Sequence, residues 1–196
     1  MTTLSGLRRL AIVAELARRM ADRGSWCGET HIQKSVYFLQ NLLQLPLSYE
    51  FVLYKHGPYS FDLHDDIVAM KARGLLEAQI KPPYGPSFVL GPLGEGTLAL
   101  FKKTCIKYGR KLDFVAAELG PKTVAELEPL ATALFVTASQ PPGRLVDDRP
   151  QRLVQLKPHI SPPDASKAVR DLDALRLRAG AACLDTPDEP CADRLG

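Results

Sequence analysis

Three stretches in the first third of the chain carry apolar residues at helical spacing. In the first, apolar residues fall on one side of a helical wheel and charged residues largely on the other, which predicts a helix over about 5–23. Apolar residues three and four positions apart predict a second helix over roughly 29–44 and a third over about 61–73. Between these two helices, an extended segment at 51–54 is followed by Gly57-Pro58, which predicts a turn.

Two short apolar stretches after the third helix predict a β-hairpin. Residues 75–80 and 87–90 read as strands, and the segment that joins them is rich in proline and contains a glycine. Three helices followed by a hairpin is the order of elements in a winged helix, in which the hairpin is the wing.

Helical periodicity returns in the second half of the chain. It predicts helical structure from residue 94 with a break at Gly109, a strongly apolar helix over 124–138, a short helix over 149–157, and a last helix from Ser161 to about Ala179. The fold class that we expect is therefore α+β, mostly helical, with a winged-helix-like core of three helices plus a β-hairpin and a C-terminal helical extension.

This order of elements suggests a division of the chain into three parts. We expect a winged-helix-like domain over 1–112 and a helical extension packed on it over 113–180. Residues 181–196 contain prolines and acids but no periodic apolar face, so we expect a disordered tail there.

Composition and charge narrow the class of protein. With 45% hydrophobic and 24% charged residues, the 196-residue chain has the composition of a soluble globular protein. No apolar run approaches the roughly 20 residues that span a bilayer, and the N-terminus lacks the pattern of a signal peptide, so we expect a cytoplasmic location and no membrane partner. The net charge of +3 permits contact with nucleic acid without requiring it.

Residues that could carry chemistry are scattered. The four cysteines form no C-x-x-C pair and have no histidine at zinc-ligand spacing, so we expect reduced thiols, no metal and no cofactor. Asp62, His64, Asp65 and Asp66 resemble a metal or hydrolase cluster, but neighbouring helix positions point about 100° apart and cannot all meet at one site. We expect no catalytic residue, with a hydrolase as a distant alternative.

Several motifs together resemble one group of proteins. They are Ile32-Gln33-Lys34, Tyr37-Phe38-Leu39, Tyr54, Gly57-Pro58-Tyr59-Ser60, Leu63 and Arg73-Gly74-Leu75-Leu76-Glu77. This combination resembles the YwgA-like group and the related Panacea-type domains, and it is similar to the C-terminal domain of the antitoxin that neutralises DNA-ADP-ribosylating toxins. Residues 156–161 and the following helix resemble the C-terminal part of YwgA-like sequences. Because members of this wider group act as antitoxins or adaptors, the resemblance implies a non-enzymatic regulatory protein that binds a toxin or a defence-system component.

The segment around the Gly57-Pro58 turn is the candidate surface for such a protein partner. Aromatic side chains are enriched at protein interfaces, although a rigid connector that sets the angle of the third helix also explains the turn. The candidate partner-binding residues are Lys34, Tyr37, Tyr54, Lys55, His56 and Tyr59.

A DNA-binding winged-helix transcriptional regulator is the alternative function. The third helix would read DNA in such a protein, but its three aspartates oppose phosphates. The candidate nucleic-acid-binding residues are therefore the cations of the first helix and of the acid-free stretch after the hairpin, which are Arg8, Arg19, Arg23, Lys102, Lys103, Lys107, Arg110 and Lys111. A solvated helix face explains the same charges. The apolar stripe of 124–135 favours packing within the chain over a homodimer contact.

Overall fold

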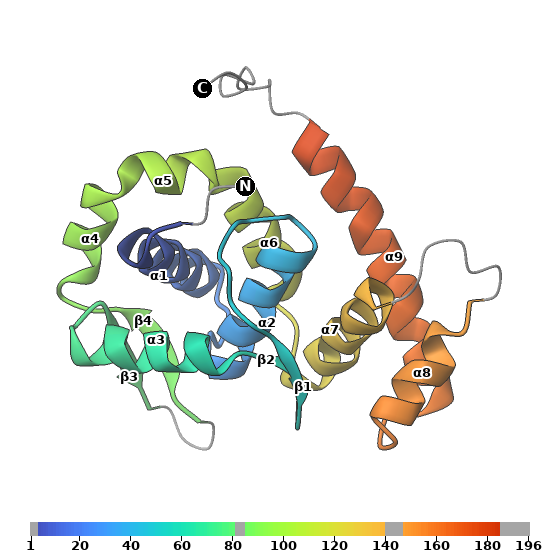
Figure 1. The fold of residues 1–196 in the computed structure, drawn as a ribbon. Coiled ribbons are helices and arrows are strands. Elements are labelled where there is room, and N and C mark those ends of the chain that lie inside the picture. Colours follow the sequence, from blue (N-terminus) through green and yellow to red (C-terminus); the bar gives the residue numbers. More distant parts are fainter. Residues whose placement is uncertain (1–3, 81–84, 140–146, 185–196) are drawn as a thin grey trace.

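The computed structural model describes residues 4–80, 85–139 and 147–184 (Figure 1). Over these residues the chain forms nine helices and two antiparallel two-stranded hairpins. This content confirms the predicted α+β, mostly helical class. No helix in the described ranges is long and apolar enough to cross a membrane.

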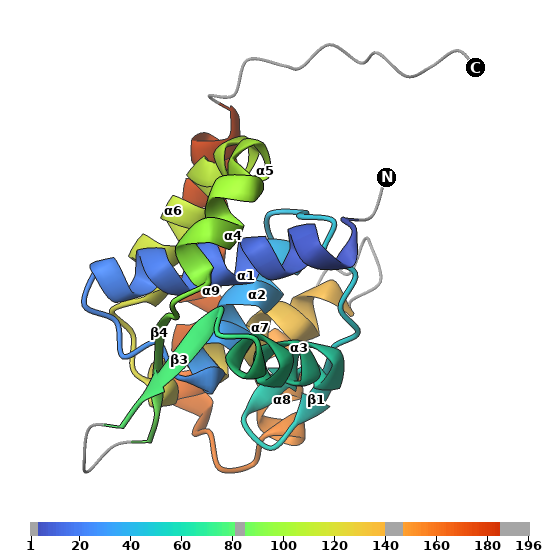
Figure 2. The ribbon, with the colours of Figure 1, turned by 90° about the vertical axis from the view of Figure 1, so that its left-hand side faces the viewer.

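Helix α1 (Gly6–Asp22) lies at the centre of the N-terminal half. Every residue from Leu10 to Ala17 is buried, because α1 is covered on several sides. One side is covered by α4 (Gly94–Leu100), α5 (Lys102–Lys107) and α6 (Gly109–Leu119), which arch around α1 (Figures 1 and 2). The sequence predicts one interruption in this arch, at Gly109. The structure places it one residue earlier, at Tyr108, and adds a second at Phe101, where the backbone also leaves the helical conformation.

Helix α2 (Glu29–Asn41) connects the two halves of the molecule. It packs against α1, α6 and α7, and also against the first hairpin. It ends three residues earlier than the predicted boundary at 44, and Gln44 adopts a left-handed φ of 56° in the connection that follows.

The first hairpin corrects the prediction of a turn at Gly57-Pro58. Strand β1 (Val52–Tyr54) pairs with β2 (Gly57–Tyr59), and the turn consists of Lys55 and His56. Gly57 has a φ of 84°, and a Cβ atom there would lie 3.2 Å from the hydroxyl of Thr132 on α7. The glycine therefore allows β2 to lie close against α7, a contact between distant parts of the chain that the local sequence pattern did not reveal.

Helix α3 and the second hairpin follow the predicted order. Helix α3 (Phe61–Ala72) is capped by Ser60, whose hydroxyl accepts a hydrogen bond from the backbone N–H of Leu63 over 3.3 Å. Strands β3 (Leu76–Gln79) and β4 (Ser87–Leu90) pair in antiparallel register, which confirms the predicted hairpin. Residues 81–84 of the connecting segment lie outside the described ranges.

Three helices form the C-terminal part. Helix α7 (Val124–Ala138) begins with a capping box formed by Thr123 and Glu126, and its apolar side chains pack within the chain, as predicted. Helix α8 (Arg149–Leu156) and helix α9 (Pro162–Leu184) pack against α7 and against each other. Helix α9 continues past the predicted end near Ala179, so residues 181–184 are helical, whereas the rest of the expected tail, 185–196, lies outside the described residues.

One cluster of buried apolar side chains joins these elements. It runs from α1 and α2 through α6 and α7 to α9. The expected boundary at residue 112 falls inside α6, so the division into 1–112 and 113–180 stays a prediction.

Candidate functional site

Two of the six candidate partner-binding residues are buried, which corrects their assignment to a binding surface. Lys34 is 1% exposed and Tyr37 is 3% exposed, because both lie on the side of α2 that faces the core. The ring of Tyr37 packs edge-on against Phe51 at 4.9 Å between centroids, and burial raises the pKa of its hydroxyl. Neither side chain is therefore available to a partner at the surface.

Lys34 holds the first hairpin onto α2. Its Nζ donates a hydrogen bond of 2.8 Å to the carbonyl of Pro58 in β2. Burial lowers the pKa of Lys34 to about 8; the negative charge of Glu128 opposes this shift and the positive charge of Lys157 adds to it. The lysine is thus a structural cation whose charge depends on a nearby carboxylate.

A second buried lysine holds the turn of the same hairpin. Lys157, at the C-terminal end of α8, donates hydrogen bonds to the carbonyls of Tyr54 and Lys55, the latter over 2.6 Å. Lysine is rarely fully buried unless it is paired, so its residue type did not suggest this position. The hairpin is therefore fixed by two cations that come from helices far apart in the sequence.

Glu128 on α7 supplies the carboxylate for these cations. One of its oxygens lies 3.6 Å from Nζ of Lys157 and 3.1 Å from Nε2 of His159, and the other lies 3.5 Å from Nδ1 of His56. The sequence signal for this role was an acid inside a strongly apolar helix, since a buried carboxylate requires partners. His56, a candidate partner-binding residue, thus lies at the edge of an ionic cluster under the hairpin.

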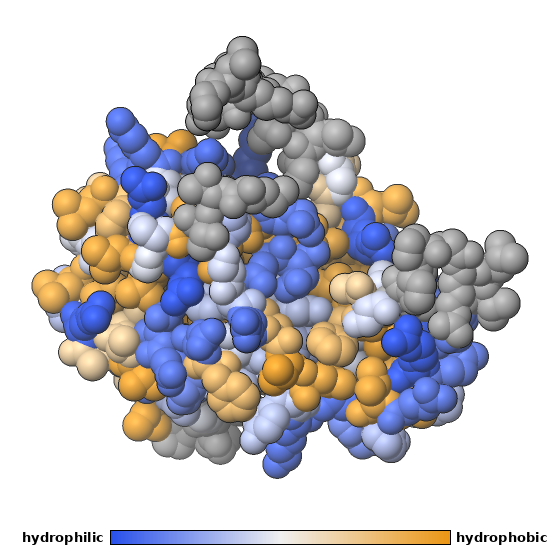
Figure 3. Space-filling model, in the orientation of Figure 1, coloured by the Kyte–Doolittle hydropathy of each residue, from blue (hydrophilic) through white to orange (hydrophobic). Residues whose placement is uncertain are grey.

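The outer side of the hairpin exposes aromatic rings. Tyr54 and Phe61 are each 55% exposed, and Tyr59 lies between them, partly buried. The ring centroids of the three residues are 5.2 to 5.8 Å apart. With the exposed side chain of Val52, these residues form what we call the hairpin surface, on the lower edge of the molecule, where hydrophobic and hydrophilic residues are mixed (Figure 3).

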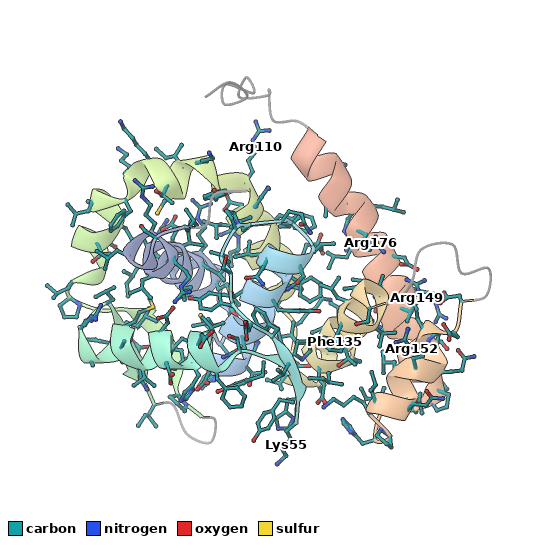
Figure 4. All side chains as sticks on the ribbon, in the orientation of Figure 1. Lys55, Arg110, Phe135, Arg149, Arg152 and Arg176 are labelled. Atoms are coloured by element: carbon teal, nitrogen blue, oxygen red, sulfur yellow. The ribbon has the colours of Figure 1, made fainter. Side chains whose placement is uncertain are left out.

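Two carboxylates lie beside this surface. The hydroxyl of Tyr59 donates a hydrogen bond of 3.0 Å to Oε1 of Glu29, and Nδ1 of His64 lies 2.7 Å from the same oxygen. Partial burial, the hydrogen bond to Glu29 and the negative charges of Glu29 and Asp65 raise the pKa of Tyr59 to about 12. Lys55, also a candidate residue, extends from the hairpin tip away from the body of the protein (Figure 4).

Val52 and Phe61 are exposed residues of this surface that the sequence pattern did not identify. Phe61 is the first residue of α3 and was counted with that helix, although only Leu63, Ile67 and Met70 of α3 are buried. Its exposure could have been predicted from its position in the helix, because Phe61 lies outside the apolar stripe that these three residues form.

Three of the eight candidate nucleic-acid-binding residues contact other parts of the chain, which corrects the assignment of Arg19 and Lys111 to an open basic surface, whereas Arg23 remains exposed. Arg19 and Arg23 both pair with Asp113, at 2.6 and 2.7 Å. Nζ of Lys111 donates a hydrogen bond of 2.8 Å to the carbonyl of Leu43. The remaining side chains are exposed, and they are Arg8, Lys102, Lys103, Lys107 and Arg110, the last of which is labelled in Figure 4.

The residues of the candidate metal or hydrolase cluster on α3 do not meet at one site, because they contact different parts of the protein. Asp66 pairs with Arg9 at 2.7 Å and accepts a hydrogen bond from Tyr49, whereas His64 pairs with Glu29. Within the ranges that the structure covers, no three histidine, cysteine or acidic side chains are grouped so that they could hold a metal ion. Cys27 and Cys105 are buried, and burial raises the pKa of both thiols.

The largest groove near the ionic cluster lies between α7 and α9 and encloses about 450 Å³. Glu128 and His159 line one part of it, and the pair Lys167–Asp171 lines another. Charges of both signs line the groove, and most of them, though not Glu128, are exposed, so the groove shows no preference for an anion or a cation.

Comparison of the chain with protein-family models, curated proteins and solved structures finds no significant match.

Proposed function

We propose that this chain is a cytoplasmic, non-enzymatic regulatory protein that binds another protein through the hairpin surface. The observation that carries the proposal is the cluster of Tyr54, Tyr59 and Phe61, in which the rings of Tyr54 and Phe61 are exposed. Aromatic side chains dominate the binding energy of many protein interfaces because they bury much apolar area with little loss of conformational freedom. Large apolar side chains that are exposed side by side, as those of Tyr54 and Phe61 are, typically mark an interaction site.

The way in which the hairpin is held supports the same proposal. Lys34 and Lys157 donate hydrogen bonds to three carbonyls, two in the strands and one in the turn, of a hairpin that would be marginally stable by itself. A surface held rigid before binding loses less entropy when the complex forms. The two buried lysines therefore suit a preformed binding site.

The class of partner comes from the resemblance to YwgA-like and Panacea-type sequences. We propose an antitoxin-like or adaptor role, in which the partner is a toxin or a defence-system component. The order α1, α2, α3 and then the β3–β4 hairpin is compatible with the winged-helix-like core of that group. In this proposal β3–β4 is the wing and β1–β2 carries the binding surface.

Affinity purification with matched variants tests the proposed function. The tagged full chain, the double variant Tyr54→Ala/Phe61→Ala and the control Leu100→Ala would be expressed in cells of the source organism. Leu100 is an exposed apolar residue on α4, away from the hairpin. We expect a stoichiometric partner with the wild type and the control but not with the double variant. Recovery of the same partner by the double variant, or of no partner by the wild type, would refute the proposal.

A DNA-binding regulator is the second candidate, and the exposed cations of α5 favour it. Lys102, Lys103 and Lys107 are all exposed in a stretch without acids. Such a surface predicts affinity for duplex DNA that falls steeply with salt. Fluorescence anisotropy with labelled random duplex tests this, with Lys102→Glu/Lys103→Glu as the variant. Absence of binding at low salt would eliminate this candidate.

A further inference from the structure

The hairpin surface continues along α3. Phe61, Asp65 and Val68 are spaced four and three residues apart, so they lie on one face of the helix. Asp65 is exposed, and Val68 is 45% exposed. A partner segment that covers the aromatic cluster would therefore also meet a carboxylate and a second apolar side chain.

The charge next to the aromatic cluster is negative. Within the described part of the chain, the side chains of Asp62 and Asp65 have no hydrogen-bond or ion-pair partner. Glu29 adds a third carboxylate, shared between Tyr59 and His64. Two exposed cations lie farther out: Lys55 points away from the protein at the hairpin tip (Figure 4), and Lys71 lies on α3 three residues beyond Val68.

Elsewhere in the protein, an arginine binds an aromatic ring and an aspartate of α3 at the same time. The guanidinium of Arg9 lies over the ring of Tyr49, with Cζ 4.3 Å from the centroid. The same arginine pairs with Asp66 at 2.7 Å, the residue that follows Asp65. An arginine, an aromatic face and an aspartate thus already form one contact at the neighbouring position of the same helix.

We propose that the partner presents an arginine-bearing basic segment to the hairpin surface, with a guanidinium on the exposed rings of Tyr54 and Phe61 and an ion pair to Asp65. This inference rests on the proposed function, since it names the chemistry of the partner at that site. Arginine suits the site better than lysine, because its planar group stacks on a ring while its N–H groups reach a carboxylate. Phosphate-bearing partners do not suit it, because the three carboxylates repel them.

Peptide binding to the full chain tests this inference. Three labelled 15-residue peptides with the same glycine-serine background would carry three arginines, three lysines or three glutamates. We expect the arginine peptide to bind most tightly, the lysine peptide more weakly and the glutamate peptide not at all in fluorescence anisotropy. We expect Asp65→Lys to weaken binding of the arginine peptide by about tenfold or more.

The control variant is Glu95→Lys, which makes the same charge change at an exposed position on α4, away from the hairpin tip (Figure 1). It should retain binding of the arginine peptide. Equal affinity for the arginine and glutamate peptides, or no loss with Asp65→Lys, would overturn the inference.

The partner-purification experiment separates this inference from the proposed function. If a partner is lost with Tyr54→Ala/Phe61→Ala but kept at full affinity with Asp65→Lys, the binding function stands and the arginine contact is wrong. If the partner is lost with both variants and kept with Glu95→Lys, both proposals are supported. Circular dichroism of each variant confirms that the fold is intact.

Discussion

Nζ of Lys34 donates a hydrogen bond of 2.8 Å to the carbonyl oxygen of Pro58, and both groups lie inside the protein. This bond fixes β2 to α2 across 24 positions of sequence. Pro58 has no N–H group, so its carbonyl is the one backbone hydrogen-bonding group that it contributes to the hairpin. The rigidity that we assign to the hairpin surface therefore depends on a lysine that no partner touches.

Replacing Lys34 by methionine should destabilise the protein. Methionine preserves the length of the side chain but leaves the buried carbonyl of Pro58 without a donor, which costs about 1–3 kcal/mol of unfolding free energy. Urea denaturation followed by circular dichroism measures this. The control Lys103→Met, at an exposed position on α5, should change the value by less than about 0.5 kcal/mol. Equal stability of the two variants would show that the Lys34 bond contributes nothing.

The lowered pKa of Lys34 predicts a pH dependence of stability. The pKa is about 8 in the folded protein, against the ordinary lysine value of 10.5, so between these values the unfolded chain binds more protons at this residue. The contribution of Lys34 to the free energy of unfolding should therefore rise with pH from about 8 to 10.5, and fall as pH is lowered through that range. Buried tyrosines and Cys27 act in the opposite direction, because burial raises their pKa and the unfolded chain therefore loses these protons at lower pH than the folded protein does.

The difference in stability between the wild type and Lys34→Met isolates this contribution, because the other groups cancel. We expect this difference to increase across pH 8 to 10.5 by about 1 kcal/mol per pH unit, measured by urea denaturation at each pH. A difference that is constant with pH would mean that the amine of Lys34 has the same pKa in the folded and unfolded states.

Local features of the fold could be predicted from the sequence, and the support of the hairpin could not. The serine cap at Ser60 and the apolar helix 124–138 depend on neighbouring residues, and both are confirmed. The burial of Lys34 and Lys157 depends on carbonyls 24 and about 100 positions away, which no local period encodes. Both lysines have a residue type that is normally exposed, and the sequence therefore placed Lys34 on the surface.

Only part of the aromatic cluster could be predicted from the sequence. Tyr54 and Tyr59 were identified from their place beside the Gly57-Pro58 segment, and the structure brings their rings within 5.6 Å. Phe61 falls outside the buried stripe of α3, so its exposure follows from the helical pattern, but its contact with the two tyrosines does not. That contact depends on the angle between α3 and the hairpin, which only tertiary packing defines.

Removing the charge of Glu128 should also destabilise the fold. Glu128→Gln leaves Lys157 and Lys34 without their carboxylate, and an unpaired buried cation costs about 3 kcal/mol. A double-mutant cycle with Lys34→Met gives the coupling between the two residues. We expect Glu128→Gln to be less destabilising in the Lys34→Met background than in the wild type, because one of the unpaired cations is then absent. Strict additivity would show that the carboxylate does not act on Lys34.

Gly57→Ala should distort the hairpin that carries the aromatic cluster. The φ of 84° at this position is strained for a residue with a side chain, and the added Cβ would lie 3.2 Å from Oγ1 of Thr132 and 3.4 Å from the carbonyl of Glu128. We expect a loss of about 1–3 kcal/mol in the free energy of unfolding and weaker binding at the hairpin surface.

The control is Gly96→Ala in α4, where a Cβ meets no atom within 4 Å and alanine favours the helix. This control should be neutral or stabilising by up to about 1 kcal/mol. Thermal and urea denaturation of both variants distinguish a requirement for glycine at position 57 from a general effect of replacing glycine. If Gly57→Ala left the free energy of unfolding unchanged, β2 would be able to move away from α7 without cost.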